Sequence, residues 1–144
     1  MQPAFLQRLA GPHGQVGDID ALLVTRGLGG GHLPERTDLE DHPRVRHARA
    51  LREDVHVFGD QRGLVTLAHG PAGRTELSAE VRPTRQGQQV GPSLIRDALT
   101  LVPAGGFVFA AISPGNARSL RAFLNVGFKP IGSEVLIPTP PCPT

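Results

Sequence analysis

One stretch, residues 81–95, constrains the fold more than any other because it joins a strand pattern to a helix pattern through a short turn rich in glycine and glutamine. Before it, residues 75–81 alternate apolar and polar side chains, as a half-exposed strand does. After Gly91, apolar residues recur at helical spacing, and Pro92 suits a first helical turn. Backbone N–H groups of residues 86–91 would then lie unpaired at the positive end of a helix dipole, which predicts an anion-binding loop.

Two common phosphate-binding fingerprints do not fit this loop. It lacks the Gly-Lys-Ser/Thr ending of a P-loop and the Gly-x-Gly-x-x-Gly of a dinucleotide site. The segment Gln86-Gly-Gln-Gln-Val-Gly91 instead resembles the acyl-CoA pyrophosphate loop of the GNAT superfamily of N-acyltransferases. A second stretch, residues 113–132, carries the same resemblance, with Asn116 as a helix N-cap, an apolar helix face, and a Gly127 stop before a strand pattern. The resemblance covers residues 55–137.

The resemblance implies a mixed fold between the α+β and α/β classes, GNAT-like, with a central, mostly antiparallel mixed sheet flanked by helices. The chain's own patterns predict a short helix at 3–9, a strand at 19–24, a helix within 37–54, strands at 55–58, 64–68 and 75–81, a helix after the loop, a strand at 107–112, a helix from Asn116, and a final antiparallel pair at 128–131 and 133–137. Residues 1–36 are expected to be an N-terminal strand and Gly-rich linker, a remnant of a longer N-terminal region. Residues 37–138 would form the acyl-CoA-binding domain, and 139–144 a Pro-rich tail.

The same resemblance implies how an acyl-CoA would be held. Acetyl-CoA would be the cosubstrate, and an amine would attack its thioester directly in a ternary complex. The backbone N–H near the end of the strand would stabilise the oxyanion. The residues implied in cosubstrate binding are Ala79 and Val81 for the pantetheine arm, Gln86, Gly87, Gln88, Gln89, Val90 and Gly91 for the pyrophosphate, and Asn116.

The attacking amine must lose a proton, so the reaction needs a general base. Glu76 and Glu80 lie on the strand that leads into the loop, and His56 or His69 on the neighbouring strands could act through water. The sequence leaves the choice among these four open. The exposed face of the helix within 37–54 carries a run of arginines, which is typical of a solvated surface, with a contact to an acidic substrate or a CoA phosphate as the alternative.

Three residues depart from the family pattern. Gln89 replaces the first loop glycine, Pro92 removes a backbone donor just inside the helix, and Phe123 stands where many members have the tyrosine that reprotonates the departing thiolate. These departures favour a slow enzyme. They also support a second interpretation, a non-catalytic acyl-CoA-binding or regulatory module on the same fold.

Composition excludes several other classes of function. The 15 basic and 13 acidic residues leave a net charge of only +2, without the basic excess of nucleic-acid-binding domains. No metal-ligand spacing is present, and neither a membrane-spanning run nor a signal-peptide pattern appears, which predicts a cytoplasmic protein. The sparse N-terminal region leaves sheet surface near residues 55–69 under-covered, which predicts a homodimer.

Overall fold

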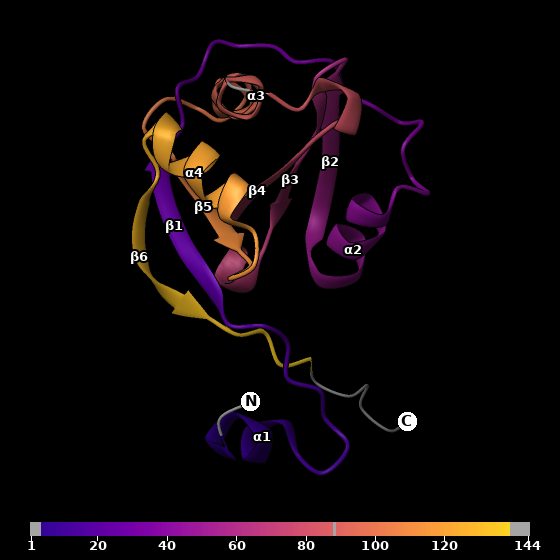
Figure 1. Cartoon of the computed structure of the whole chain (residues 1–144), viewed down its shortest axis with the longest axis vertical. Coiled ribbons are helices and arrows are strands. Elements are labelled where there is room, and N and C mark those ends of the chain that lie inside the picture. Colours follow the sequence, from indigo (N-terminus) through magenta and orange to yellow (C-terminus); the bar gives the residue numbers. More distant parts are fainter. Residues whose placement is uncertain (1–3, 88, 139–144) are drawn as a thin grey trace.

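The computed structural model describes residues 4–87 and 89–138, which fold around one six-stranded sheet (Figure 1). The strands are β1 (Asp20–Arg26), β2 (Glu53–Asp60), β3 (Gly63–His69), β4 (Thr75–Val81), β5 (Phe107–Ile112) and β6 (Lys129–Glu134). They lie in the order β2-β3-β4-β5-β1-β6, and each neighbouring pair is antiparallel except β4 and β5, which are parallel. The predicted class, a mostly antiparallel mixed sheet flanked by helices, is confirmed.

Helices cover both faces of the sheet. They are α1 (Ala4–Ala10), α2 (Pro43–Leu51), α3 (Val90–Leu99) and α4 (Ala117–Val126), with short 3-10 turns at Pro71–Gly73 and Pro83–Arg85. In Figure 1, α2 lies beside β2, whereas α3 and α4 lie over the other part of the sheet. None of the seven residues of α1 is buried, and Figure 1 shows α1 apart from the sheet. Among the helices of the described residues, none has the length and apolar character needed to cross a bilayer.

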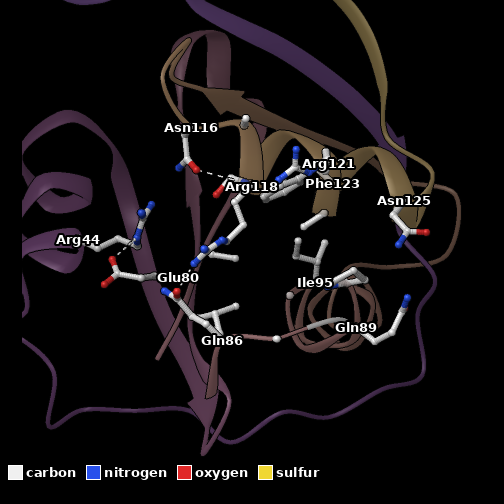
Figure 2. A pocket seen from close by; sticks show the side chains of 18 of the residues that line it. Arg44, Glu80, Gln86, Gln89, Ile95, Asn116, Arg118, Arg121, Phe123 and Asn125 are labelled. Atoms are coloured by element: carbon white, nitrogen blue, oxygen red, sulfur yellow. Dashed lines mark hydrogen bonds and ion pairs between the residues drawn. The ribbon is translucent and has the colours of Figure 1, made fainter. Parts of the chain in front are cut away.

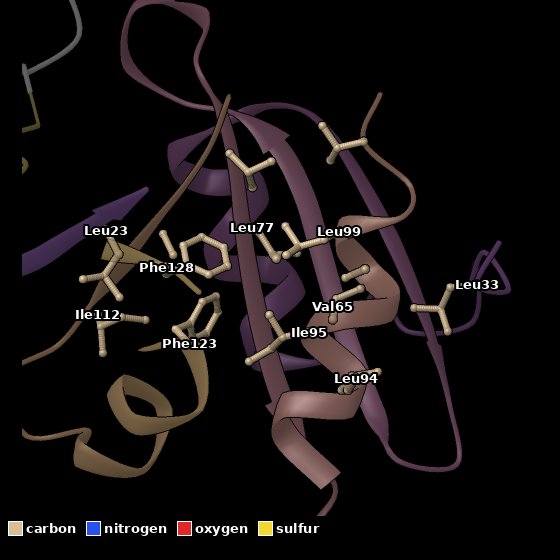
Figure 3. Packing of buried hydrophobic residues seen from close by; sticks show 14 residues of the cluster. Leu23, Leu33, Val65, Leu77, Leu94, Ile95, Leu99, Ile112, Phe123 and Phe128 are labelled. Atoms are coloured by element: carbon tan, nitrogen blue, oxygen red, sulfur yellow. The ribbon is translucent and has the colours of Figure 1, made fainter. Parts of the chain in front are cut away.

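Alternation along the strands separates two cores. Val65 of β3 and Leu77 of β4 join the larger core beneath α3 and α4, shown in Figure 3. Leu64 of β3 joins the smaller core beneath α2, because successive side chains of a strand point to opposite faces. The apolar stripe predicted for α3 is buried as expected, and its members are Leu94, Ile95, Ala98, Leu99 and, just past the helix, Val102. Glu76 and Glu80 of β4 therefore lie on the α2 face.

The first and last strands of the described chain are neighbours in the sheet. β1 lies between β5 and β6 and is antiparallel to both, with Leu23 fully buried. The final pair of strands predicted at 128–131 and 133–137 is wrong. A single strand, β6, occupies this region and takes β1 as its partner, while residues 135–138 form no strand. β6 therefore forms its backbone hydrogen bonds with β1 and not with a second strand next to it in the sequence.

At the opposite edge, β2 is partly covered. Glu35 forms a bridge with Phe58, and backbone bonds from Arg36 to Val57 and from Gly59 to Pro34 hold the preceding segment against this strand. The uncovered part of the edge is therefore the beginning of β2. The homodimer expected from this region stays a prediction.

The parallel strands β4 and β5 diverge. The one registered pair between them in the described chain is Glu76 with Phe109, whereas β4 pairs with β3 along its whole length. Beyond that pair, the backbone of β4 on its β5 side has no ladder partner. The carboxyl ends of the two strands thus border an opening in the sheet.

Candidate functional site

A cleft of about 800 Å³ lies at the diverging ends of β4 and β5 (Figure 2). Its walls come from the end of β4, the loop before α3, and the first turns of α3 and α4. The sequence-predicted cosubstrate residues that line it are Ala79, Val81, Gln86, Gly87, Gln89, Gly91 and Asn116. Val90 does not line the cleft, and Gln88 lies outside the described residues. The fold thus brings two separate sequence motifs to one cavity.

The N-terminus of α3 opens into this cleft without a side-chain cap from any described residue. Its N-cap is Gln89, whose φ of 71° and ψ of −7° place it in the left-handed region that favours glycine. Ser93 donates the first helical bond to the Gln89 carbonyl, and Pro92 has no N–H. The backbone N–H groups of Val90 and Gly91 are therefore the donors that this helix end offers to a ligand.

Gly91 also sets how closely α3 and α4 approach each other. A Cβ added there would lie 3.3 Å from the Cβ of Ala122 and 3.6 Å from Cγ2 of Val81. The absence of a side chain keeps the backbone of the first α3 turn open toward the cleft. A large side chain at this position would enter the cavity or separate the two helices.

The opposite wall is the first turn of α4. Asn116 caps this helix, because its Oδ1 accepts a hydrogen bond of 3.1 Å from the Ser119 N–H, as the sequence predicted. Arg118 reaches across the cleft and donates to the side-chain oxygen of Gln86, as Figure 2 shows, and Arg121 lines the same wall. The α4 wall therefore contributes positive charge through side chains. No motif in the sequence distinguished these two arginines from surface residues.

Phe123 lies at the base of the cleft and in the core at once. Its side chain is 1% exposed and packs edge-to-face on Phe128, with ring centroids 4.9 Å apart and an interplanar angle of 75°. It also borders the cleft. The ring carries no ionisable group, so it can shape the cavity but cannot donate a proton.

Glu80 is the predicted base that reaches the cleft. Its Oε2 accepts a 2.9 Å hydrogen bond from Nε of Arg44 (Figure 2). Its Oε1 lies 3.7 Å from Nε2 of His42. Arg44, which the sequence placed on a solvated face, instead lines the cleft. Its position four residues before buried Ala48 on α2 is the signal that could have identified it, because such residues share one side of a helix.

Glu76 is buried, although the sequence predicted that it would lie on the exposed face of a strand. Its side chain is 4% exposed, and its Oε1 accepts hydrogen bonds from Arg52 at 3.2 Å and Arg74 at 3.4 Å. Its Oε2 lies beside Gly70 and has no hydrogen-bond partner among the described residues. Two arginines from different elements compensate the buried carboxylate, which alternation within β4 cannot reveal. Glu76 lines a smaller cavity next to the cleft, not the cleft itself.

His56 and His69 lie away from the cleft. His56 bridges Glu35 and Asp54 at 3.2 and 3.0 Å, and these hydrogen bonds raise the pKa of its imidazole. His69 lies 3.9 Å from the same Asp54. Neither ring lines the cleft, so the structure brings neither of them to the site that Glu80 occupies.

Comparison with known proteins gives one similar structure to report. No family model matches the sequence, and no curated protein matches it. The structure is similar to that of a GNAT-family protein from Novosphingobium aromaticivorans DSM 12444, with 14% sequence identity and a TM-score of 0.48. The match covers 86% of this chain and 66% of that protein, so the chain spans just under two thirds of its length.

Proposed function

We propose that this protein binds an acyl-CoA, with acetyl-CoA as the expected donor, and transfers its acyl group to an amine. The observation that carries the proposal is the N-terminus of α3, which has no side-chain cap and opens into a cleft of about 800 Å³. Cavities of this size accommodate organic ligands, and a helix N-terminus favours an anionic group. A pyrophosphate attached to a long arm satisfies both features.

The cleft has a place for each part of such a ligand. The N–H groups of Val90 and Gly91 would receive the pyrophosphate, together with the loop residues before them, and Arg118 would face it from α4. The pantetheine arm, which contains amide groups, would lie along β4 from Ala79 to Val81. There the backbone lacks the β5 ladder and can bond a ligand instead.

The chemistry supplied by the bound acyl-CoA is an activated thioester carbonyl. An amine nitrogen would form a bond to that carbon, the carbon–sulfur bond would break, and the thiolate would leave and take a proton from water. Glu80 would accept the proton of the attacking amine, and the hydrogen bond from Arg44 would hold its carboxylate in position. The N–H near Val81 would stabilise the oxyanion, where one such donor contributes about 3 to 4 kcal/mol.

A second candidate is a non-catalytic acyl-CoA-binding module. The observation that favours it is Phe123, whose ring offers no proton donor at the base of the cleft. Both candidates require acyl-CoA binding, and only the first requires product. Incubation with acetyl-CoA and a panel of amines, followed by mass spectrometry of the acylated amine, separates them.

Ligand-dependent thermal stability tests the binding step. A ligand present at 100 times its Kd stabilises a protein by about 2.7 kcal/mol, which corresponds to several degrees in Tm for a chain of this size. We expect CoA to raise the Tm of the wild-type protein. Gly91→Glu should abolish the increase, because the new side chain places bulk and like charge at the pyrophosphate position.

Gly132→Glu provides the matched control. Gly132 lies on β6 away from the cleft, and an added Cβ there meets no atom within 4 Å. This variant should retain the wild-type response to CoA. An unchanged wild-type Tm at millimolar CoA would remove the assignment of the cleft to an acyl-CoA.

A further inference from the structure

A second, smaller cavity of about 130 Å³ lies beneath α2 beside the cleft. Its walls come from α2, β3, β4 and the carboxyl end of β5, and Arg44 lines both cavities. Along the α2 face of β4, Glu76 and Ser78 line the small cavity and Glu80 lines the cleft. The two cavities are therefore successive positions along one strand, and Arg44 lies between them.

One carboxylate oxygen at the small cavity lacks a hydrogen-bond partner among the described residues. Oδ1 of Asp20 is buried and accepts no hydrogen bond from any described residue. Asp20 precedes Ala21, which pairs with Ile112, so it lies at the carboxyl end of β5 where the sheet opens. Burial, together with the neighbouring charges of Asp18 and Glu134, raises the pKa of Asp20, and the charges of Arg52 and His47 offset only part of this increase. A ligand cation in contact with Asp20 would relieve the rest.

The same cavity also carries guanidinium groups with spare donors. Arg44 gives its Nε to Glu80, and Arg52 gives one Nη to Glu76. Each guanidinium has five N–H donors, so both retain donors that are not used within the described chain. Arg52 is 15% exposed and Arg44 31%, so both are sheltered from competing water on one side. Free guanidinium donors favour a carboxylate or a similar anion.

We infer that the small cavity binds a small amine that also carries an anionic group, as an amino acid does, and that this is the acceptor class of the acyl transfer. The ammonium would lie at Asp20 and the anionic group at Arg44 and Arg52. The role of the amino acid as acyl acceptor rests on the proposed function, whereas its binding in the small cavity does not. A simple amine would leave the guanidinium donors unused, and a simple anion would leave Asp20 unpaired.

The inference also fits the volume and the chemistry. A cavity of about 130 Å³ exceeds the space of one water several-fold, about 10 to 15 Å³ by the same kind of measure, yet is far smaller than the cleft. For reaction, the amino acid would turn about its anionic group at Arg44, so that its nitrogen leaves Asp20, loses a proton to Glu80 and forms the new bond to the acyl carbon. The thiolate of CoA is released as the leaving group, so no further reactant is needed.

Titration of the CoA-free full-length protein, followed by NMR or calorimetry, tests the binding. The probes are glycine and alanine, with ethylamine and acetate as ligands that carry only one of the two groups. We expect saturable binding of glycine or alanine, and binding weakened about tenfold or more in Asp20→Asn, since the variant loses a hydrogen bond between charged groups. Asp18→Asn removes the same charge from an exposed neighbour and should retain binding.

Three results would overturn the inference: ethylamine binding as tightly as glycine, Asp20→Asn binding as tightly as wild type, or no probe binding at tens of millimolar. The CoA thermal shift reports separately on the cleft. A CoA shift without amino-acid binding would remove this inference and leave the proposed function. Amino-acid binding that depends on Asp20, without a CoA shift or acylated product, would remove the proposed function and leave the amino-acid site in the small cavity.

Discussion

The two helices that border the cleft begin in different ways, although each follows a strand of the parallel pair. α4 begins at Asn116, whose side chain occupies the Ser119 N–H. α3 begins at Gln89 in a left-handed conformation, and no described side chain caps it. One N–H at the start of α4 is thus bonded by a side chain of the protein, while no N–H at the start of α3 is bonded by a described side chain. We infer that α3 contributes backbone to the ligand and α4 contributes side chains.

The largest effects are expected from the two aromatic residues Phe123 and Phe128, which pack edge-to-face. In Phe128→Tyr, the added hydroxyl enters the core and should cost about 1 to 3 kcal/mol of unfolding free energy, because Phe128 is 2% exposed and lines no cavity described above. In Phe123→Tyr the cost should be smaller, because this ring borders the cleft and its hydroxyl can reach a ligand or water. Chemical denaturation measures both variants.

Phe123→Tyr also tests whether α4 takes part in the chemistry. If the ring edge of Phe123 faces the thioester sulfur, Phe123→Tyr should raise turnover, with CoA affinity nearly unchanged, because general acid catalysis contributes about 10²- to 10⁴-fold. Equal destabilisation of the two tyrosine variants with no gain in turnover would show that the α4 wall contributes packing alone at this position.

The charge on α4 should have an intermediate effect. Arg118→Gln removes the guanidinium that reaches Gln86 across the cleft, and we expect CoA affinity to fall about tenfold, the size of one charged hydrogen bond. The loss should shrink at high salt, because exposed charges are screened. Arg96→Gln, on the exposed side of α3, is the matched control. Equal CoA affinities in the two variants, measured by calorimetry, would assign the anion site to α3 alone.

The smallest effects should have opposite signs at the two helix starts. Asn116→Ala removes the cap of α4 and should lower the unfolding free energy by about 1 kcal/mol. Gln89→Gly relieves the left-handed conformation at the start of α3 and should raise it by about 0.5 kcal/mol, after the extra entropy of the unfolded glycine is counted. Urea denaturation without ligand measures both. Destabilisation of similar size in the two variants would mean that the two helix starts are equivalent.

Features set by neighbours in the chain could be predicted from the sequence. The Asn116 cap and the Gly127 stop, whose φ is 111°, are confirmed, as are the strand at 75–81 and the apolar stripe of α3. Each depends on the conformational preference or periodicity of a few adjacent residues. The anion-binding loop was predicted in the same way, because its strand, turn and helix are contiguous. Its role in cosubstrate binding stays a prediction.

What only the tertiary structure decided involves partners from distant elements. Strand pairing placed β1 between β5 and β6, and so replaced the predicted terminal hairpin with one strand. The burial of Glu76 depends on Arg52 after α2 and Arg74 before β4, and Asp20 reaches the small cavity only because β1 lies beside β5. Local patterns carry no information on which distant charges meet, since ion pairing and strand register depend on the whole fold. The sequence therefore determined the elements and the loop, and the tertiary structure determined which charges the two cavities contain.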